Sequence, residues 1–213
     1  METVWDNVTH FEEIVAEYAG SEYAVAVDSC TNALFLSMQA FKALNVDDET
    51  SRVTVPTRTY ISVPMQVRHC GYHIEFTDMS WSGVYELAPL PIVDSAQRFT
   101  KNMYQKGTLY CLSFHSKKIL SIGRGGMILT DNIKYRDWLR AARYDGRSSI
   151  YYNDLSVTGV DVLGWHMYMT PEEAVRGIEQ FYKTSSVNND NGCSEDYAVD
   201  LSTLNCFNER NCK

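Results

Sequence analysis

The sequence predicts an α/β fold, a three-layer sandwich in which helices cover both faces of a mostly parallel central sheet. Short apolar runs of strand length alternate with amphipathic segments of helix length along most of the chain, and this alternation is typical of strand–helix–strand units. The chain has 213 residues, of which 45% are hydrophobic, and this is enough for one sizeable core.

The composition argues against two classes of protein, those that bind nucleic acids and those that span membranes. The 19 basic and 27 acidic residues give a formal charge of −8, which argues against a general nucleic-acid surface. No apolar run approaches the roughly 20 residues that span a membrane, and the start, METVWDNVTH, has neither a basic nor an apolar segment. We therefore expect a cytoplasmic protein with no membrane or nucleic-acid partner.

The cysteines predict buried thiols more strongly than disulfides. None of them forms a Cys-x-x-Cys pair, and the first three lie in or beside apolar segments. The last three lie in a polar tail, where no histidine follows Cys193 to complete a tetrahedral zinc site, so we expect no metal. Disulfides and a zinc site in the tail remain the weaker alternatives.

The first elements are a helix, a strand and a second helix. Thr9-His-Phe-Glu12 reads as a capping box, and the apolar residues after it recur at helical spacing up to Gly20. A strand over Tyr23–Val27 then leads into DSCTNALFLSMQAF, which begins polar and becomes helical. Backbone N–H groups and the dipole at such a helix start favour a phosphate, although an ordinary helix cap has the same pattern.

The middle of the chain contains short strands. We expect strands at Arg52–Pro56 and His73–Asp78, with a helix-like stretch between them despite Pro64. After the brief segment WSGVYELAPLP, residues Ile92–Asp94 form a buried strand that ends in a carboxylate.

The most informative stretch is Cys111–Thr130, CLSFHSKKILSIGRGGMILT. Leu109–Phe114 reads as a buried strand that brings the pair Lys117-Lys118 to its end, and a glycine-rich turn and a second apolar run, Met127–Leu129, follow. A lysine that is desolvated and crowded by another cation has a lowered pKa, which makes its amine a nucleophile. Such an amine meets the requirement for a Schiff base.

The remaining elements end at a boundary near Lys183. DNIKYRDWLRAARYDGR predicts a helix capped by Asp131 and stopped at Gly146, with solvated arginines. A tyrosine-rich loop, Ser148–Met169, precedes a capping box at Thr170 and a helix with an apolar stripe. We therefore expect one domain over residues 1–183 and a polar tail over 184–213.

The pattern Ser-Phe-His-x-x-Lys followed by Gly-x-Gly-Gly resembles the Schiff-base segment of the DegT/DnrJ/StrS family, the sugar aminotransferases of fold type I that depend on pyridoxal 5′-phosphate (PLP). The resemblance covers about residues 11–181. It implies a reduced form of the family's large PLP-binding domain, because family members usually have a further strand–helix unit between Ser80 and Pro91 and a second domain beyond Lys183. The resemblance places the Schiff-base lysine at Lys118, and Lys117 replaces a small hydroxyl residue.

The resemblance also implies a set of cofactor-binding residues. Ser29-Cys30-Thr31 matches the Ser-Gly-Thr turn that binds the PLP phosphate, although Cys30 adds a Cβ where the backbone approaches the phosphate. Tyr60 matches an aromatic residue that stacks on the cofactor ring. Asp94 matches the partner of the pyridine nitrogen, Gln97 would hydrogen-bond near the phenolic oxygen, and Ser113 belongs to the same set.

In the family, the loop after residue 148 crosses to a partner subunit, where an Asn-Tyr-Arg segment reaches the neighbour's PLP phosphate. The matching residues here are His166, Met167 and Tyr168, and the histidine could serve as the phosphate donor. A two-fold dimer would also cover the stripe of the last helix. We therefore expect a homodimer whose PLP site includes residues of both chains.

The resemblance implies an aminotransferase that moves an amino group from an amino acid such as glutamate to a keto sugar attached to a nucleotide. Lys118 would hold PLP and, once released, shuttle the proton. The lysine favours transamination over the family's dehydratase branch, which has a histidine at that position. The alternative is a non-catalytic relative that binds PLP or a sugar nucleotide, or that only pairs with a partner chain.

Overall fold

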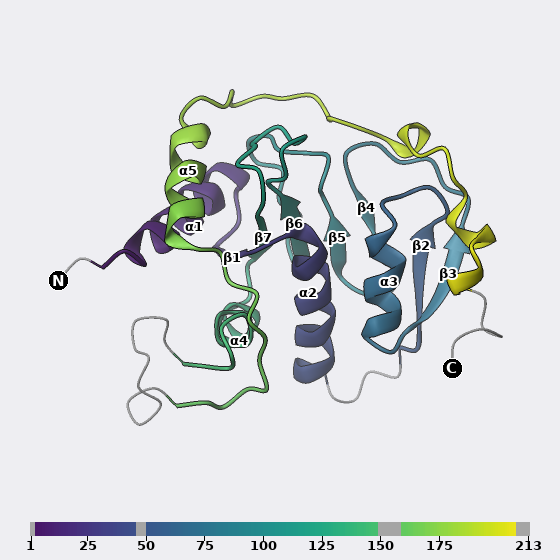
Figure 1. Ribbon diagram of the computed structural model, residues 1–213, viewed down its shortest axis with the longest axis horizontal. Helices are drawn as coiled ribbons and strands as arrows, with labels where there is room; N and C mark the ends of the chain where they lie inside the picture. The colour runs from purple at the N-terminus through teal and green to yellow at the C-terminus, as the bar shows by residue number, and fades with distance from the viewer. Residues whose placement is uncertain (1–2, 46–49, 149–158, 208–213) are drawn as a thin grey trace.

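The chain forms an α/β sandwich with two sheets (Figure 1). The computed structural model describes residues 3–45, 50–148 and 159–207. The larger sheet has five strands in the order β1-β7-β6-β5-β4, and β2 and β3 form a separate pair. The strands are β1 Tyr23–Val27, β2 Arg52–Pro56, β3 His73–Thr77, β4 Tyr85–Glu86, β5 Ile92–Asp94, β6 Leu109–Ser113 and β7 Gly126–Thr130.

The five-stranded sheet is mixed, so the prediction of a mostly parallel sheet is wrong for it. Strands β5 and β6 are parallel, whereas β1–β7, β6–β7 and β4–β5 are antiparallel. The physical reason is the connections: β6 turns directly back into β7 through the glycine-rich segment, and a short connection of this kind makes neighbouring strands antiparallel. Between β2 and β3 the chain crosses over through a helix, and these two strands are parallel.

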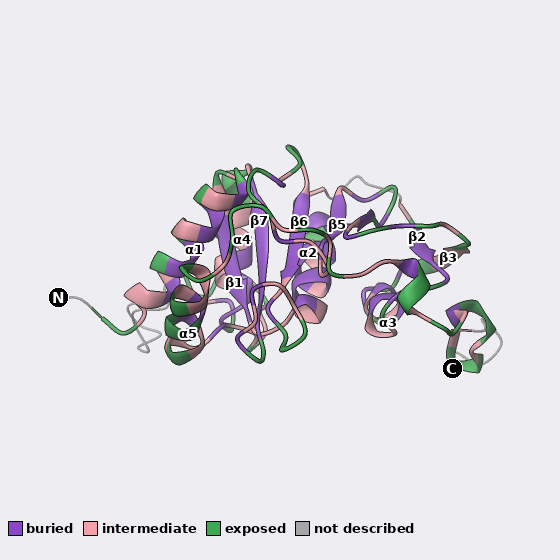
Figure 2. Cartoon of the chain, turned by 90° about the horizontal axis from the view of Figure 1, so that it is seen from above, coloured by how far each residue is buried: buried purple, intermediate pink, exposed green. Residues whose placement is uncertain are grey.

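Helices cover both faces of the larger sheet, as predicted. The side chains of β1 alternate between the two faces: Ala24 and Ala26 pack in a cluster with α1, and Val25 and Val27 pack in a cluster with α2. Figure 2 shows these central strands buried between helices whose outer sides are exposed. The helices are α1 Asp6–Ala19, α2 Cys30–Leu44, α3 Ser62–His69, α4 Ile133–Ala142 and α5 Pro171–Phe181.

Two of the predicted helix starts are wrong. Helix α1 begins one turn before the expected capping box, after Trp5, although it ends at Gly20 in the left-handed conformation (φ 83°) as expected. Helix α4 is capped by Asn132, whose side chain accepts a hydrogen bond from the Lys134 amide. The capping box of α5 is confirmed, with Thr170 and Glu173 hydrogen-bonded to each other's backbone.

A buried ion-pair network joins α1, β1 and α4, and it corrects the expectation that the arginines of α4 are solvated. Glu12 is 2% exposed and accepts hydrogen bonds from the Ala26 amide at 2.8 Å, from Arg140 at 2.8 Å and from Arg143. Arg143 is 3% exposed and also donates to the Ala26 carbonyl at 2.5 Å. Because one buried carboxylate faces two guanidinium groups and an amide, its charge is compensated.

The segment after α5 packs against the domain. It runs across the sandwich from α5 to the edge at β3 (Figure 1), and we call residues 187–201 the strap. Arg98 binds Asp190 through two hydrogen bonds of 2.7 Å, and the Leu201 amide donates to the Thr57 carbonyl at 2.8 Å. The described part of the tail is therefore polar in sequence but packed against the domain.

Three further predictions concern the cysteines, a membrane-spanning segment and a metal site. Cys30, Cys70 and Cys111 are buried free thiols, as expected, whereas Cys212 lies outside the described residues. No helix in the described part of the chain is long and apolar enough to cross a membrane. Within the same ranges, no group of three or more histidine, cysteine, aspartate or glutamate side chains is arranged to hold a metal ion.

Candidate functional site

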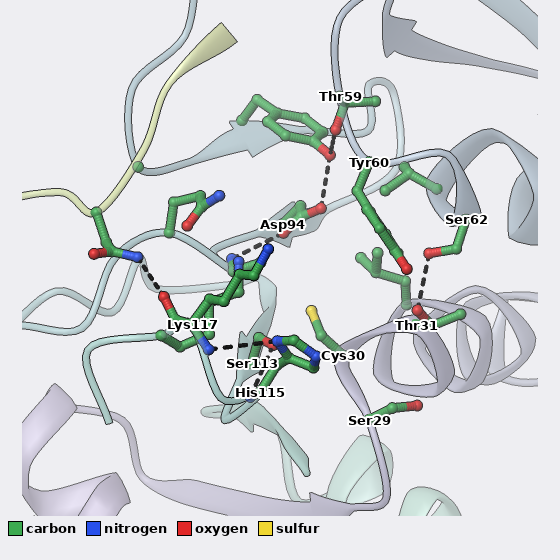
Figure 3. A pocket seen from close by; sticks show the side chains of 18 of the residues that line it. Ser29, Cys30, Thr31, Thr59, Tyr60, Ser62, Asp94, Ser113, His115 and Lys117 are labelled. Atoms are coloured by element: carbon green, nitrogen blue, oxygen red, sulfur yellow. Dashed lines mark hydrogen bonds between the residues drawn. The ribbon is translucent and has the colours of Figure 1, made fainter. Parts of the chain in front are cut away.

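One cavity of about 770 Å³ collects residues from distant parts of the sequence (Figure 3). It lies where β5 and β6 end and α2 begins, next to the loop after β2. The residues predicted for the site that line it are Ser29, Cys30, Thr31, Tyr60, Asp94, Gln97, Ser113 and Lys118. The predicted residues therefore lie together, with His166 as the exception.

The start of α2 forms a polar end of the cavity. Ser29 is the N-cap and accepts a hydrogen bond from the Asn32 amide at 3.2 Å, and the Thr31 hydroxyl lies 2.8 Å from that of Ser62 on α3. The first N–H groups of an α-helix have no carbonyl partner within the helix. Hydroxyls and amides thus converge at a positive helix end, as an anion requires.

A glycine on β7 allows this turn to lie close to the sheet. A Cβ on Gly126 would be 2.4 Å from the Ser29 carbonyl carbon and 2.6 Å from the Cys30 nitrogen, which is too close for a side chain. The turn and β7 therefore pack backbone to backbone. The signal in the sequence was the glycine-rich segment, but its packing against Ser29 could not be read from it.

Cys30 is a neutral side chain in the wall. Burial raises the pKa of its thiol well above the ordinary value, so the group stays protonated at neutral pH. Its Sγ points to the carbonyl of Cys111 at 3.8 Å. The residue that departs from the glycine of the family motif thus lines the cavity without bringing a charge.

Asp94 is a buried carboxylate at the end of β5. It is 5% exposed, and its Oδ2 accepts a hydrogen bond from the Tyr85 hydroxyl at 2.6 Å while its Oδ1 accepts one from the Ala96 amide at 2.9 Å. Burial raises the pKa of Asp94, and these two hydrogen bonds lower it. In the described residues no lysine, arginine or histidine forms an ion pair with Asp94.

The two neighbouring lysines differ in environment. Lys118 is partly buried and Lys117 is exposed, although both line the cavity. Burial is the main cause that lowers the pKa of Lys118, so its amine is less often protonated than a free lysine. A less protonated amine is a better nucleophile, which favours Lys118 over its neighbour.

Two further side chains that line the cavity are Gln97 and Tyr60. Gln97 donates to the Tyr197 hydroxyl at 3.2 Å, and in the part of the chain that the structure describes its buried Oε1 has no hydrogen-bond partner. Tyr60 is 58% exposed and lines the cavity with Thr31 and Ser62 nearby (Figure 3). A free ring face and an unpaired amide oxygen both suit a planar polar ligand.

His166 lies apart from the cavity wall. Its Nδ1 is 3.1 Å from an oxygen of Asp145, and its ring packs against Tyr144 and Tyr168. The neighbouring Met167 carbonyl accepts a hydrogen bond from the Asp28 amide, next to the turn at Ser29. The side chain of His166 is 66% exposed, so the contact predicted for it with another subunit's cofactor stays a prediction.

Several residues of the site were missed by sequence reasoning. Trp81 and Tyr85 come from a loop and from the short strand β4, which have no recognisable motif, whereas Thr59 directly precedes Tyr60, the aromatic residue that the family resemblance identified. The strap contributes Asn191, Asp196 and Tyr197. Asn191 links two walls: its amide donates to the Gln97 carbonyl and its side chain to the Lys117 carbonyl, both at 2.7 Å. These positions depend on tertiary packing, for which the sequence held no local signal.

Known proteins resemble this chain over most of its length. The sequence matches the model of the DegT/DnrJ/EryC1/StrS aminotransferase family over residues 2–101 and 92–198. The spore coat polysaccharide biosynthesis protein SpsC of Bacillus subtilis is 26% identical, and the match covers 81% of this chain and 56% of SpsC.

Solved structures resemble it in fold. AtS13 from Actinomadura melliaura superimposes with a TM-score of 0.72 at 18% identity, over 83% of this chain and 59% of that one. The aminotransferase from Psychrobacter cryohalolentis gives a TM-score of 0.68 at 21% identity, over 84% and 56%. At these identities the likeness concerns the fold alone. The chain spans little more than half the length of these relatives.

Proposed function

The chain belongs to the DegT/DnrJ/EryC1/StrS aminotransferase family, and on this premise we propose that it is a PLP-dependent aminotransferase. It would move an amino group from an amino acid such as glutamate to a keto sugar, carried on a nucleotide. The observation that carries the proposal is the placement of Lys118 and Asp94 in one cavity with the polar turn at Ser29–Thr31.

The residues in the cavity fit PLP. The phosphate would lie at the start of α2, where Ser29, Thr31 and Ser62 supply hydroxyls. Asp94 is buried and forms no ion pair with a cation of the described residues, so it suits a ligand that brings a protonated ring nitrogen. Lys118 would hold the cofactor covalently through Nζ.

When bound, PLP supplies an electron sink for the carbanion that forms when the amino donor loses its α-proton. The residues of this chain would do the rest. Asp94 would hold the ring nitrogen in its protonated form, Tyr60 would stack on the ring, and Gln97 would orient its phenolic side. Lys118, once released by the incoming amine, would move the proton, and its lowered pKa suits an amine that must accept one.

The absorbance of the protein mixed with PLP tests the proposal. We expect a visible band from lysine-bound cofactor, and we expect glutamate to abolish that band as the amino group is transferred to the cofactor. A band that forms and then persists with every amino acid tried would instead indicate the non-catalytic relative. Failure to form any band would contradict PLP binding itself.

We also propose that the protein is a homodimer. The apolar stripe of α5 packs partly on α1, but Val175 is 39% exposed and Tyr182 is 69% exposed, which leaves apolar surface for a second copy. Of the loop Ser148–Met169, expected at the interface, the structure describes Ser148 and residues 159–169. Exposed His166 is available to another subunit.

Sedimentation of the PLP-loaded protein measures this assembly. We expect a dimer. We also expect His166→Ala to weaken PLP binding without dissociating the dimer, because the imidazole would approach the phosphate held by the other chain's Ser29 and Thr31. His69→Ala is a matched control, since His69 is likewise an exposed histidine outside the cavity wall, but it lies at the end of α3 and not on the loop expected to cross to the partner. A monomer that still binds PLP tightly would contradict the proposal.

A further inference from the structure

A chain of buried hydroxyl groups ends on Asp94. The Thr59 hydroxyl lies 2.5 Å from the Tyr85 hydroxyl, which lies 2.6 Å from Asp94 Oδ2 (Figure 3). Thr59, Tyr85 and Asp94 are 3%, 5% and 5% exposed, so water reaches none of them freely. Three polar groups at this depth are stable only when each has a partner.

The direction of these hydrogen bonds follows from the number of protons. An ionised carboxylate only accepts, so the Tyr85 hydroxyl must donate its one proton to Asp94. The oxygen of Tyr85 is then free to accept, and Thr59 must be the donor to it. Burial raises the pKa of Tyr85 well above its ordinary value, so the phenol keeps the proton that it donates.

The backbone holds Tyr85 at this position. Strands β4 and β5 are antiparallel with Tyr85 directly opposite Asp94, and side chains opposite each other project from the same face of a sheet. The ring of Tyr85 also packs against Trp81 with centroids 4.9 Å apart. The phenol therefore reaches Asp94 from a fixed direction.

We propose that Tyr85 is a positioning residue for Asp94: its hydroxyl, itself oriented by Thr59, holds the buried carboxylate ionised and turned toward the cavity. The role for the cofactor rests on the proposed function, because an ionised Asp94 is what a protonated pyridine nitrogen requires. The effect of Tyr85 on Asp94 itself does not depend on that function.

The other titratable groups around Asp94 have smaller effects on its pKa or carry no charge at neutral pH. Lys118 lowers its pKa through its charge, but less than the Tyr85 hydrogen bond does. Cys30 on α2 and Cys111 on β6 are neutral thiols at pH 7 because burial raises the pKa of both, and burial also raises the pKa of Tyr197 on the strap. Tyr85 is therefore the side chain that most favours the ionised form of Asp94.

The test is the titration of Asp94 in the protein without PLP, followed by ¹³C NMR of carboxyl-labelled aspartate and assigned with Asp94→Asn. Losing one hydrogen bond to a charged group should raise the pKa of Asp94 by about one pH unit in Tyr85→Phe. Thr59→Val should shift it in the same direction by less, because Tyr85 still donates. If Tyr85→Phe does not fold, Thr59→Val decides alone.

Tyr104→Phe is the matched control. Its hydroxyl is half-buried and donates to the Thr108 carbonyl at 3.0 Å, outside the cavity, so its loss should leave the titration of Asp94 unchanged. Equal titration midpoints for Asp94 in the wild type, Tyr85→Phe and Thr59→Val would overturn the proposal.

The role for the cofactor is read separately, from the ¹⁵N shift of labelled PLP bound to each protein. In Tyr85→Phe we expect the ring nitrogen to lose its proton at a lower pH than in the wild type and in Tyr104→Phe. An unchanged ring nitrogen in a variant whose Asp94 pKa has risen would overturn the cofactor role. If the wild type binds no PLP, the proposed function fails, while the carboxyl titration still decides whether Tyr85 controls Asp94.

Discussion

Replacing Lys118 by alanine is expected to abolish the PLP that borohydride fixes to the protein, whereas Lys117→Ala should only weaken it. Lys118 is partly buried with a pKa lowered by burial, and Lys117 is exposed beside it. Only an unprotonated amine adds to the cofactor aldehyde, so the buried lysine reacts more readily. The loss in Lys118→Ala should be complete, because Lys117 is exposed and no third lysine of the described residues lines the cavity.

Digestion and mass spectrometry of the reduced protein locate the modified lysine. The labelled peptide should contain residues of the glycine-rich segment, with the added mass on Lys118. Lys106→Ala, at a position that does not line the cavity, should trap as much PLP as the wild type. A label on Lys117 would show that the proposed register is shifted by one residue.

Asp94→Asn is expected to leave PLP able to bind but to slow the exchange of the amino group with glutamate by about a hundredfold or more. The pyridine nitrogen would lose its anionic partner, and removing one member of a buried charge pair costs about 3 kcal/mol or more. Single-turnover absorbance with glutamate measures this rate. Asp131→Asn is the control, because this carboxylate accepts from the Gly107 amide outside the cavity.

The thermal stability of Asp94→Asn distinguishes a functional role of Asp94 from a structural one. Burial raises the pKa of Asp94 above its unfolded value, so the folded state binds more protons, and stability falls as pH rises from the unfolded pKa through the folded one. The ionised carboxylate is thus unfavourable for folding at neutral pH, and Asp94→Asn should melt at the same or a higher temperature. A large loss of stability with an unchanged exchange rate would indicate a structural role.

Much of the fold could be predicted because the central strands are buried on both faces. Residues of Tyr23–Val27, Leu109–Ser113 and Gly126–Thr130 therefore read as nearly continuous apolar runs. The direction of pairing is not encoded in such runs, because parallel and antiparallel partners bury the same side chains. Strand β4 has two residues, too few for any periodic pattern, and it was missed.

The site likewise contains residues that the sequence could predict and residues that it could not. Asp94 ends one predicted strand and Lys118 follows another, so their place at one edge of the sheet could be expected from the sequence and the family resemblance. Tyr85 enters the site only because β4 pairs with β5, and Tyr197 enters it because the strap folds back across the domain. Contacts between distant segments of this kind leave no mark in the local sequence.

The strap has a consequence for the order in which the protein folds. Asp190 contacts Arg98 and Ser82 across sequence separations of 92 and 108 residues, and contacts so far apart form slowly because a long loop must close first. Until the strap has docked, the carbonyls of Gln97 and Lys117 lack the hydrogen bonds that Asn191 donates to them. During synthesis, the helices and strands up to β7 can assemble while the cavity still lacks one wall, so high-affinity capture of a ligand should begin only after residue 197 has left the ribosome.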